Sequence, residues 1–114
     1  IEIFNAIIDE KLDQINIEWD SRPAACIIAA SGGYPGKYQT GYEIEGLEEI
    51  EKEENVIVFH AGTKYENERY YTAGGRVLGI TALDNTFEMA VSRAYEGISK
   101  IGFKDMHYRK DIGV

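Results

Sequence analysis

Two glycine-rich segments carry the residues best suited to contact a ligand. The first consists of Gly32, Gly33, Tyr34, Pro35 and Gly36. Consecutive glycines let a backbone approach a bound anion closely and leave its N–H groups unshielded. Glycine and proline are also the ordinary residues of turns, and a tight loop between strands is the simpler interpretation. The segment is therefore a candidate binding loop that also fits a plain turn.

The second segment, Gly74, Gly75 and Arg76, places a guanidinium beside two residues that have no obstructing side chain. Such an arginine can bind a phosphate or a carboxylate through two parallel hydrogen bonds. A hairpin turn with a solvated arginine explains the same residues equally well. Both interpretations stay open when only the residues are considered.

The remaining polar residues do not have the spacing of a catalytic or metal centre. His60 follows an expected strand, but no nucleophile, paired carboxylate or metal-ligand pattern accompanies it, so a hydrogen-bonded structural histidine is favoured. The sequence has no P-loop and no G-x-G-x-x-G pattern after a strand. Residues 107–111 form a local basic patch, which is either a docking surface or a solvated end.

The composition indicates one globular domain with an acidic surface. The chain has 114 residues, of which 44% are hydrophobic and 28% charged. It has 12 Lys and Arg against 20 Asp and Glu, a net charge of -8 that repels phosphate backbones and anionic membranes. We therefore expect neither nucleic acid nor a membrane as a partner. Cys26 lies in an apolar run and is expected to be a small buried residue.

Membrane spans and secretion signals are absent from the sequence. No stretch reaches the roughly 18 apolar residues that a membrane helix needs, and the start lacks the pattern of a signal peptide. We therefore expect a cytoplasmic protein. The sequence does not begin with Met and opens on an amphipathic pattern, from which we expect a fragment of a longer protein.

The hydrophobic pattern predicts the elements that position these residues. Apolar residues spaced by three and four predict a helix over residues 1–13, and alternation predicts a half-buried strand over residues 15–19. The apolar run of residues 24–30 predicts a central strand. The other expected elements are strands at residues 42–45, 56–60, 69–72 and 77–82, a short acidic helix at 46–54 and a hairpin loop at 64–68.

The clearest helix is predicted to begin at Asn85, with Glu88 completing a capping box, and to end at Ile101 before Gly102. Its expected buried stripe is Phe87, Ala90, Val91, Ala94, Ile98 and Ile101. Strands cluster between terminal helices without alternating with them. This order indicates an α+β fold with an antiparallel sheet.

Four motifs, in order along the chain, resemble the C-terminal domain of the phosphoribosylamine-glycine ligase family. They are Ala-Ser-Gly-Gly-Tyr-Pro-Gly at residues 30–36, Phe-His-Ala-Gly-Thr at 59–63, Gly-Gly-Arg-Val-Leu-Gly-Ile-Thr-Ala at 74–82 and Met-His-Tyr-Arg-Lys-Asp-Ile-Gly at 106–113. Residues 1–22 resemble the segment that leaves the ATP-grasp region of these enzymes. The resemblance thus implies a boundary between residues 1–22 and a C-terminal ligase domain over residues 23–114.

The resemblance also implies a function. The family, also called glycinamide ribonucleotide synthetases, joins glycine to phosphoribosylamine with ATP and magnesium (or manganese) in purine biosynthesis. Its C-terminal domain is a small antiparallel β unit flanked by helices, similar to the corresponding domain of biotin carboxylase, and packs on the ATP-grasp and N-terminal domains. By similarity to sibling enzymes, the residues expected to face the ribose phosphate are Gly32, Gly33, Tyr34, Pro35, Gly74, Gly75 and Arg76.

The family's ATP-binding and metal-binding residues have no counterpart in this sequence. The resemblance therefore implies that the isolated chain holds no cofactor and catalyses nothing. Two other functions remain as alternatives. One is a free-standing acidic binding module, and the other is a structural domain that only braces its neighbour. An ATP-grasp region upstream in the full reading frame would decide between them.

Overall fold

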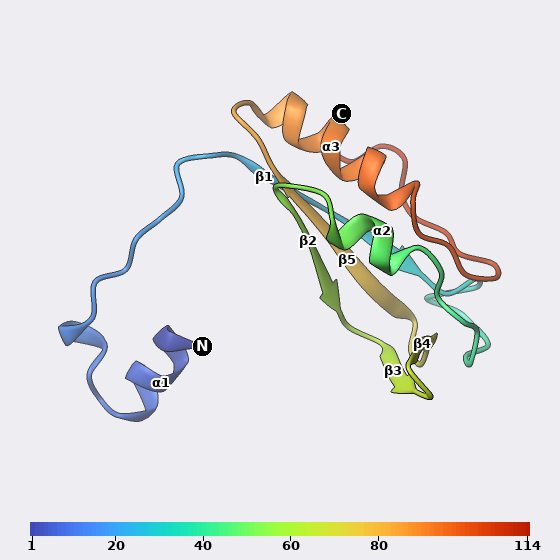
Figure 1. The fold of residues 1–114 in the computed structure, drawn as a ribbon, viewed down its shortest axis with the longest axis horizontal. Helices are drawn as coiled ribbons and strands as arrows, with labels where there is room; N and C mark the ends of the chain where they lie inside the picture. The colour runs from blue at the N-terminus through green and yellow to red at the C-terminus, as the bar shows by residue number, and fades with distance from the viewer.

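The computed structural model describes residues 1–114 as a sheet-based unit with a projecting N-terminal arm (Figure 1). The arm contains the helix α1 (Glu2–Ile8) and the 3-10 helix η1 (Leu12–Gln14). The other elements, in chain order, are β1 (Ala24–Ala30), α2 (Leu47–Glu51), β2 (Val56–His60), β3 (Thr63–Glu66), β4 (Arg69–Thr72), β5 (Arg76–Leu83) and α3 (Phe87–Ile98). The predicted α+β class with antiparallel strands is confirmed.

A three-stranded antiparallel sheet with the order β1-β5-β2 forms the centre of the unit. Ile80 on β5 pairs with Ile27 on one side and with Val58 on the other. Residues 24–30 form a strand as expected, but it is an edge strand of the sheet. The central strand is β5, which is longer and pairs with both β1 and β2. The far edge of β1 is bonded through Ala30, which exchanges backbone hydrogen bonds of 2.8 and 3.0 Å with His107.

A separate hairpin, β3-β4, extends from the end of this sheet (Figure 1). Its turn is Asn67 and Glu68, both with positive φ angles, as a two-residue hairpin turn requires. The predicted loop at residues 64–68 was therefore too long, since residues 64–66 pair with β4. Residues 64–66 were not predicted as a strand because they are mostly polar. The predicted strand at residues 42–45 is reduced to isolated bridges at Glu43 and Glu45.

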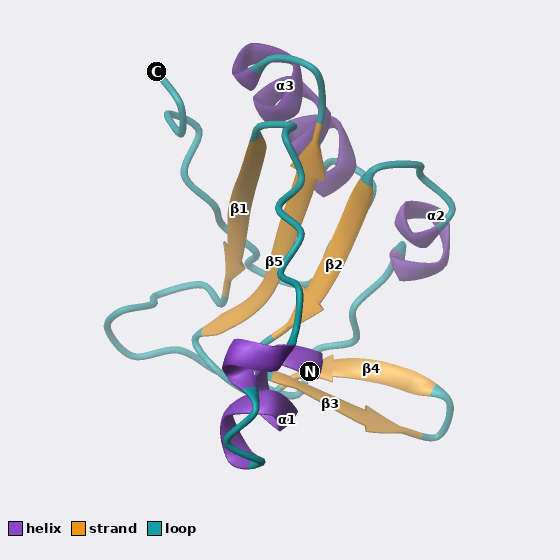
Figure 2. Ribbon diagram, turned by 90° about the vertical axis from the view of Figure 1, so that its left-hand side faces the viewer, coloured by secondary structure: helices purple, strands orange, loops and turns teal.

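Helix α3 covers one face of the sheet, and the core lies between them (Figure 2). Ala90, Ala94 and Ile98 are buried against it as predicted, whereas Phe87 remains exposed. The side chain of Thr86, and not Asn85, caps the helix by accepting a hydrogen bond from the Met89 N–H at 3.2 Å. The helix ends at Ile98, before the predicted Ile101, because Gly102 exchanges backbone hydrogen bonds with Glu45 instead of capping it.

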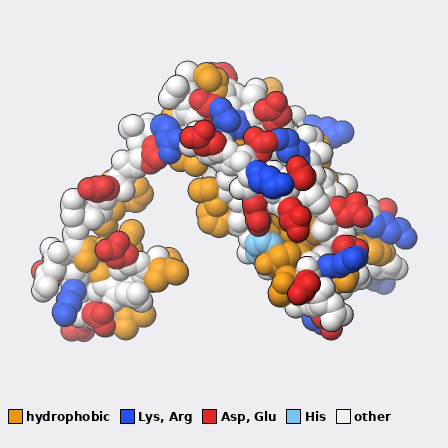
Figure 3. Space-filling view, in the orientation of Figure 1, with side chains coloured by type: hydrophobic (Ala, Val, Ile, Leu, Met, Phe, Trp, Pro, Cys, Tyr) orange, Lys and Arg blue, Asp and Glu red, His pale blue; other side chains and the backbone are white.

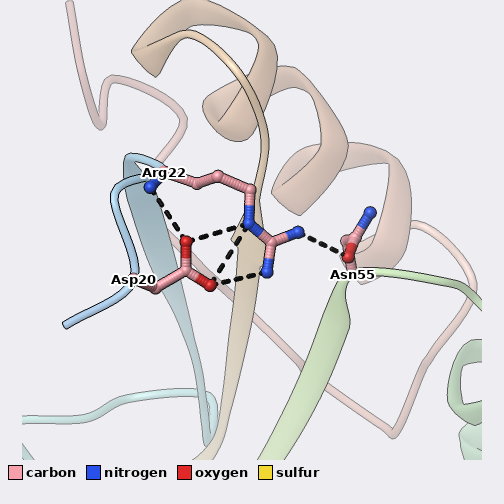
Figure 4. A network of polar contacts seen from close by, with 3 residues as sticks. All are labelled: Asp20, Arg22 and Asn55. Atoms are coloured by element: carbon pink, nitrogen blue, oxygen red, sulfur yellow. Dashed lines mark hydrogen bonds and ion pairs between the residues drawn. The ribbon is translucent and has the colours of Figure 1, made fainter. Parts of the chain in front are cut away.

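The arm is mostly exposed, and its predicted elements are shortened. Helix α1 ends early because Glu10 takes a positive φ of 56°. The predicted strand at residues 15–19 was wrong, since these residues pair with no strand. A polar clip at the base of the arm joins Asp20, Arg22 and Asn55 (Figure 4). Arg22 donates to both carboxylate oxygens of Asp20 and, at 2.8 Å, to Oδ1 of Asn55.

None of the helices is long and apolar enough to cross a membrane.

Candidate binding site at the glycine-rich loops

The two glycine-rich segments meet because β1 and β5 are antiparallel neighbours. The end of β1 therefore lies beside the start of β5, where Ala30 pairs with Arg76. Ser31 then bonds both glycines of the second segment: its Oγ donates to the Gly74 carbonyl and its N–H to the Gly75 carbonyl, each at 2.7 Å. These contacts hold the two loops together although more than 40 residues separate them in the sequence.

The end of β2 completes the site from the other side. The N–H of Gly62 donates to the carbonyl of Arg76 at 2.8 Å. A Cβ atom on Gly62 would come within 2.7 Å of that oxygen and 2.8 Å of the Gly74 Cα. Only a glycine at residue 62 allows these backbones to approach so closely.

These segments form an open depression of about 530 Å³. It is lined by Ile28, Tyr34, Ala61, Gly62, Gly75 and Arg76. Arg76 is its only charged residue. The Arg76 side chain is exposed and takes part in none of the ion pairs of the chain. The depression can therefore offer a free guanidinium to an anionic ligand.

The structure brings together three of the seven predicted site residues, Tyr34, Gly75 and Arg76. The other four lie outside the depression and have structural roles or open surroundings. Gly33 has a φ of 97° and turns the loop against the Lys37 carbonyl, as a plain turn requires. Gly74 lies against Gly62, Gly32 lies against Asp105, and Pro35 is exposed.

The sequence reasoning missed three lining residues, Ile28, Ala61 and Gly62. The break after an apolar strand was the available signal for Ala61 and Gly62. Ile28 could not be found because its direction depends on which face of the sheet is covered. His60 fits the structural interpretation, since its Nδ1 lies 2.9 Å from Thr63 Oγ1 and its ring centroid 4.5 Å from that of Tyr70.

Arg76 is unpaired, whereas other arginines of the chain form ion pairs with carboxylates. In the basic patch at residues 107–111, Arg109 forms an ion pair of 2.7 Å with Asp111 and lowers the pKa of that carboxyl. The backbone N–H of Asn85 and the guanidinium of Arg93 likewise lower the pKa of Asp84. No group of three His, Cys, Asp or Glu side chains is placed to hold a metal ion. The unpaired Arg76 thus differs from Arg93 and Arg109, which are occupied.

The depression borders a sheet face that no helix covers. Ile28 and Phe59 flank Gly79 on this face, together with Cys26, whose Sγ would lie 3.2 Å from a Cβ on Gly79. Cys26 is therefore exposed, and its predicted burial was wrong. Ile28, Ile57 and Phe59 are 44%, 46% and 56% exposed. We call the surface formed by Cys26, Ile28, Ile57, Phe59 and Gly79 the open sheet face.

The arm lies in front of the open sheet face and does not cover it (Figure 2). Figure 3 shows hydrophobic side chains on the edge of the sheet unit that faces the arm, and others on the arm itself. Phe4, Ile8 and Trp19 of the arm are among the most exposed apolar residues of the chain. Two apolar surfaces thus border the space between arm and sheet.

Comparison with known proteins gives consistent matches. The family described as "Phosphoribosylglycinamide synthetase, C domain" matches residues 24–114. A phosphoribosylamine-glycine ligase of Caldanaerobacter subterraneus subsp. tengcongensis is 46% identical over 112 residues, which are 98% of this chain and 26% of that protein. A ligase of the same name from Fusobacterium nucleatum subsp. nucleatum is 43% identical over 115 residues, covering 99% of this chain and 27% of the relative.

A solved structure agrees with these relatives. The crystal structure of a phosphoribosylamine-glycine ligase from Thermotoga maritima matches with a TM-score of 0.74 and 29% identity, over 96% of this chain and 27% of that one. The chain therefore spans about a quarter of the length of the proteins it matches.

Proposed function

This chain belongs to the phosphoribosylglycinamide synthetase C-domain family, and from that premise we propose that it forms one wall of the substrate site in a ligase that joins glycine to phosphoribosylamine. The free-standing binding module is not favoured, because the relatives contain this region as about a quarter of a longer ligase. An enzyme of purine biosynthesis of this kind is expected in the cytoplasm.

The unpaired guanidinium of Arg76 is the observation that carries the proposal. A substrate with a ribose 5-phosphate needs a cation at that end, and the chain as a whole is acidic, with a net charge of -8. Arg76 is the only charged residue of a depression that Tyr34, Gly62 and Gly75 also line. A phosphate there can accept two hydrogen bonds from the guanidinium.

We also propose that this chain docks on the upstream domains of the ligase, and the open sheet face supports this. Ile28 belongs both to this face and to the depression, so a domain that covers the face reaches the edge of the Arg76 site. Ligand sites commonly lie at such domain boundaries. We propose that the N-terminal and ATP-grasp domains occupy the space between arm and sheet, and that residues 1–22 connect to them.

ATP and magnesium or manganese belong to the proposed reaction, but the side chains of this chain do not fit them. It offers no cluster of metal ligands, and a divalent ion that bridges phosphates needs carboxylate or similar oxygen ligands. We therefore assign both to the upstream domains. What this chain contributes is binding and orientation of phosphoribosylamine.

Steady-state kinetics of Arg76→Ala in the full-length ligase test the proposal. A charge-assisted bidentate contact is worth about 1.5 to 3 kcal/mol, so the KM for phosphoribosylamine should rise about ten- to a hundredfold. The constants for ATP and glycine should stay nearly unchanged. Arg76→Lys should restore only part of the loss, because an ammonium cannot form the two parallel bonds.

The matched control is Arg69→Ala, which removes a hairpin cation that pairs with Glu43 and does not line the depression. It should leave all three constants at the parent values. If Arg76→Ala behaves like this control and only lowers the melting temperature, Arg76 is structural and the phosphate is bound elsewhere.

A further inference from the structure

A second positively charged hollow lies on the other flank of the first glycine-rich loop, where Gly32 contacts Asp105. Its volume is about 510 Å³. Gly32, residues 37–39 and Tyr42 of the loop form one side, and Lys104 and Asp105 form the other. It shares no lining residue with the Arg76 depression.

The cations of this hollow are unpaired. The ion pairs of the chain engage Lys52, Lys64 and Lys100, whereas Lys37 and Lys104 take part in none. The ammonium of Lys104 lies 5.4 Å from the ring centroid of Tyr42. A cation–π contact of this kind holds the ammonium without using its hydrogen-bond donors. Two free ammonium groups thus line one hollow of an acidic chain.

Neutral groups add to the binding capacity of the hollow. The Tyr42 hydroxyl donates to Gln39 Oε1 at 2.7 Å, which fixes the amide and leaves its NH2 group without a protein partner. The ring of Tyr38 is also partly exposed here. The only opposing charge is the carboxylate of Asp105. The lining therefore consists mainly of cations and hydrogen-bond donors, as an anion requires.

The two sides of the hollow are fixed relative to each other. A Cβ on Gly32 would come within 2.6 Å of the Asp105 Cβ and 2.7 Å of its carbonyl oxygen, so the turn at Lys104 packs directly on the loop. The paired backbone hydrogen bonds between Ala30 and His107 anchor this turn to the end of β1. Lys104 thus extends from a segment that is held in place beside the loop.

We propose that this hollow is a second anion site, which binds the dianion of a phosphate group through Lys37 and Lys104. Two ammonium groups balance the two charges of a phosphate monoester, and the amide of Gln39 can donate to a third oxygen. This site is independent of the Arg76 depression and does not rest on the function proposed for it. The phosphate can come from inorganic phosphate or from the end of a sugar phosphate.

NMR titrations of the 114-residue chain with inorganic phosphate, ribose 5-phosphate and AMP, at constant ionic strength, test the proposal. The backbone signals of Gly32 and Asp105 and the side-chain amide of Gln39 should shift in a saturable way. Lys37→Ala and Lys104→Ala should each weaken binding about two- to fivefold. Lys110→Ala, which removes an exposed lysine outside the hollow, should have no effect on these shifts.

Asp105→Asn makes the test sharper, because it should strengthen binding. It removes the opposing charge, and asparagine tolerates the positive φ of 63° at this residue. Equal affinities for the three ligands would identify the phosphate group itself as the ligand. If ribose 5-phosphate or AMP binds more tightly than inorganic phosphate, and Tyr38→Ala removes this difference, the ligand extends over the Tyr38 ring. Absence of saturable shifts, or equal effects of Lys37→Ala and Lys110→Ala, would overturn the proposal.

Discussion

The ring of Tyr34 lies so close to the backbone of Gly75 that a Cβ atom at residue 75 would come within 2.1 Å of Tyr34 Cδ2. This contact joins the first glycine-rich loop to the second, and both residues line the Arg76 depression. The absence of a side chain at residue 75 is therefore a packing requirement of Tyr34 as well as an opening toward a ligand.

Gly75→Ala should destabilise the chain by displacing this ring. Gly75 does not have a positive φ, so alanine fits the backbone and the cost comes from the overlap, about 1 to 3 kcal/mol. In a Tyr34→Ala background the same change should cost little, which a double-mutant cycle in urea would measure. Gly102→Ala is the matched control, since nothing lies within 4 Å of its Cβ. Additive effects of the two substitutions would contradict the packing.

Ile98→Asp should unfold the chain. Ile98 is fully buried between α3 and the sheet, and the substitution removes its apolar contacts and buries a charge. The combined cost is about 5 kcal/mol or more, which approaches the whole stability of a small domain. Circular dichroism should show a loss of the cooperative melt. Met89→Asp, on the exposed side of the same helix, should melt close to the parent temperature.

The strands and the helix that were predicted correctly have a hydrophobic pattern that matches the residues buried in the core. Residues 24–30 and 56–60 are apolar enough to indicate strands, and the spacing of Ala90, Ala94 and Ile98 indicates the face of α3 that packs. The hairpin strand β3 was missed because it is polar and exposed on both faces. Hydrophobic periodicity indicates which residues are buried, so it does not reveal a strand that is exposed on both faces.

Cys26 shows a second limit of the sequence. An unbroken apolar run predicts a strand that is buried on both faces, but in this chain only one face is covered. The run is consistent with a partner surface that the 114 residues do not supply. Contacts between distant turns, such as Tyr34 with Gly75, could not be predicted either, because they depend on where β1 and β5 end after the sheet has formed.

Stability should fall in acid through carboxylates that are bonded in the native state. The hydrogen bond from the Asn85 N–H and the Arg93 ion pair lower the pKa of Asp84 below its ordinary 3.8, and bonds from Arg22 lower that of Asp20 to about 2. The unfolded chain then binds protons at a higher pH than the native chain. The stabilisation by these two carboxylates is complete above their ordinary pKa. It is lost as the pH falls through their lower pKa in the native chain.

Asp84→Asn isolates one of these carboxylates. At neutral pH it should melt below the parent, because the attraction to Arg93 is gone while an acceptor for the Asn85 N–H remains. The difference in Tm should shrink below about pH 4 and vanish once Asp84 of the parent is protonated. Asp13→Asn, on the exposed arm, should follow the parent at every pH. A Tm difference that is constant from neutral to acid pH would contradict the assignment.

Phe59, on the open sheet face, should matter more for stability in the full-length ligase than in the 114-residue chain. Phe59→Thr keeps a residue that favours strands and removes a ring that is 56% exposed. In the 114-residue chain it should change the free energy of unfolding by no more than about 0.5 kcal/mol. In the full-length ligase, where we propose that upstream domains cover the face, it should cost about 1.5 to 3 kcal/mol of domain docking. Tyr65→Thr is the control, because Tyr65 is 61% exposed, packs on Tyr70 of the hairpin and is not part of the open sheet face, so its cost should be the same in both contexts. Chemical denaturation of the two proteins measures the difference. If Phe59→Thr, like Tyr65→Thr, costs the same in the full-length ligase as in the 114-residue chain, the open sheet face is not the docking surface.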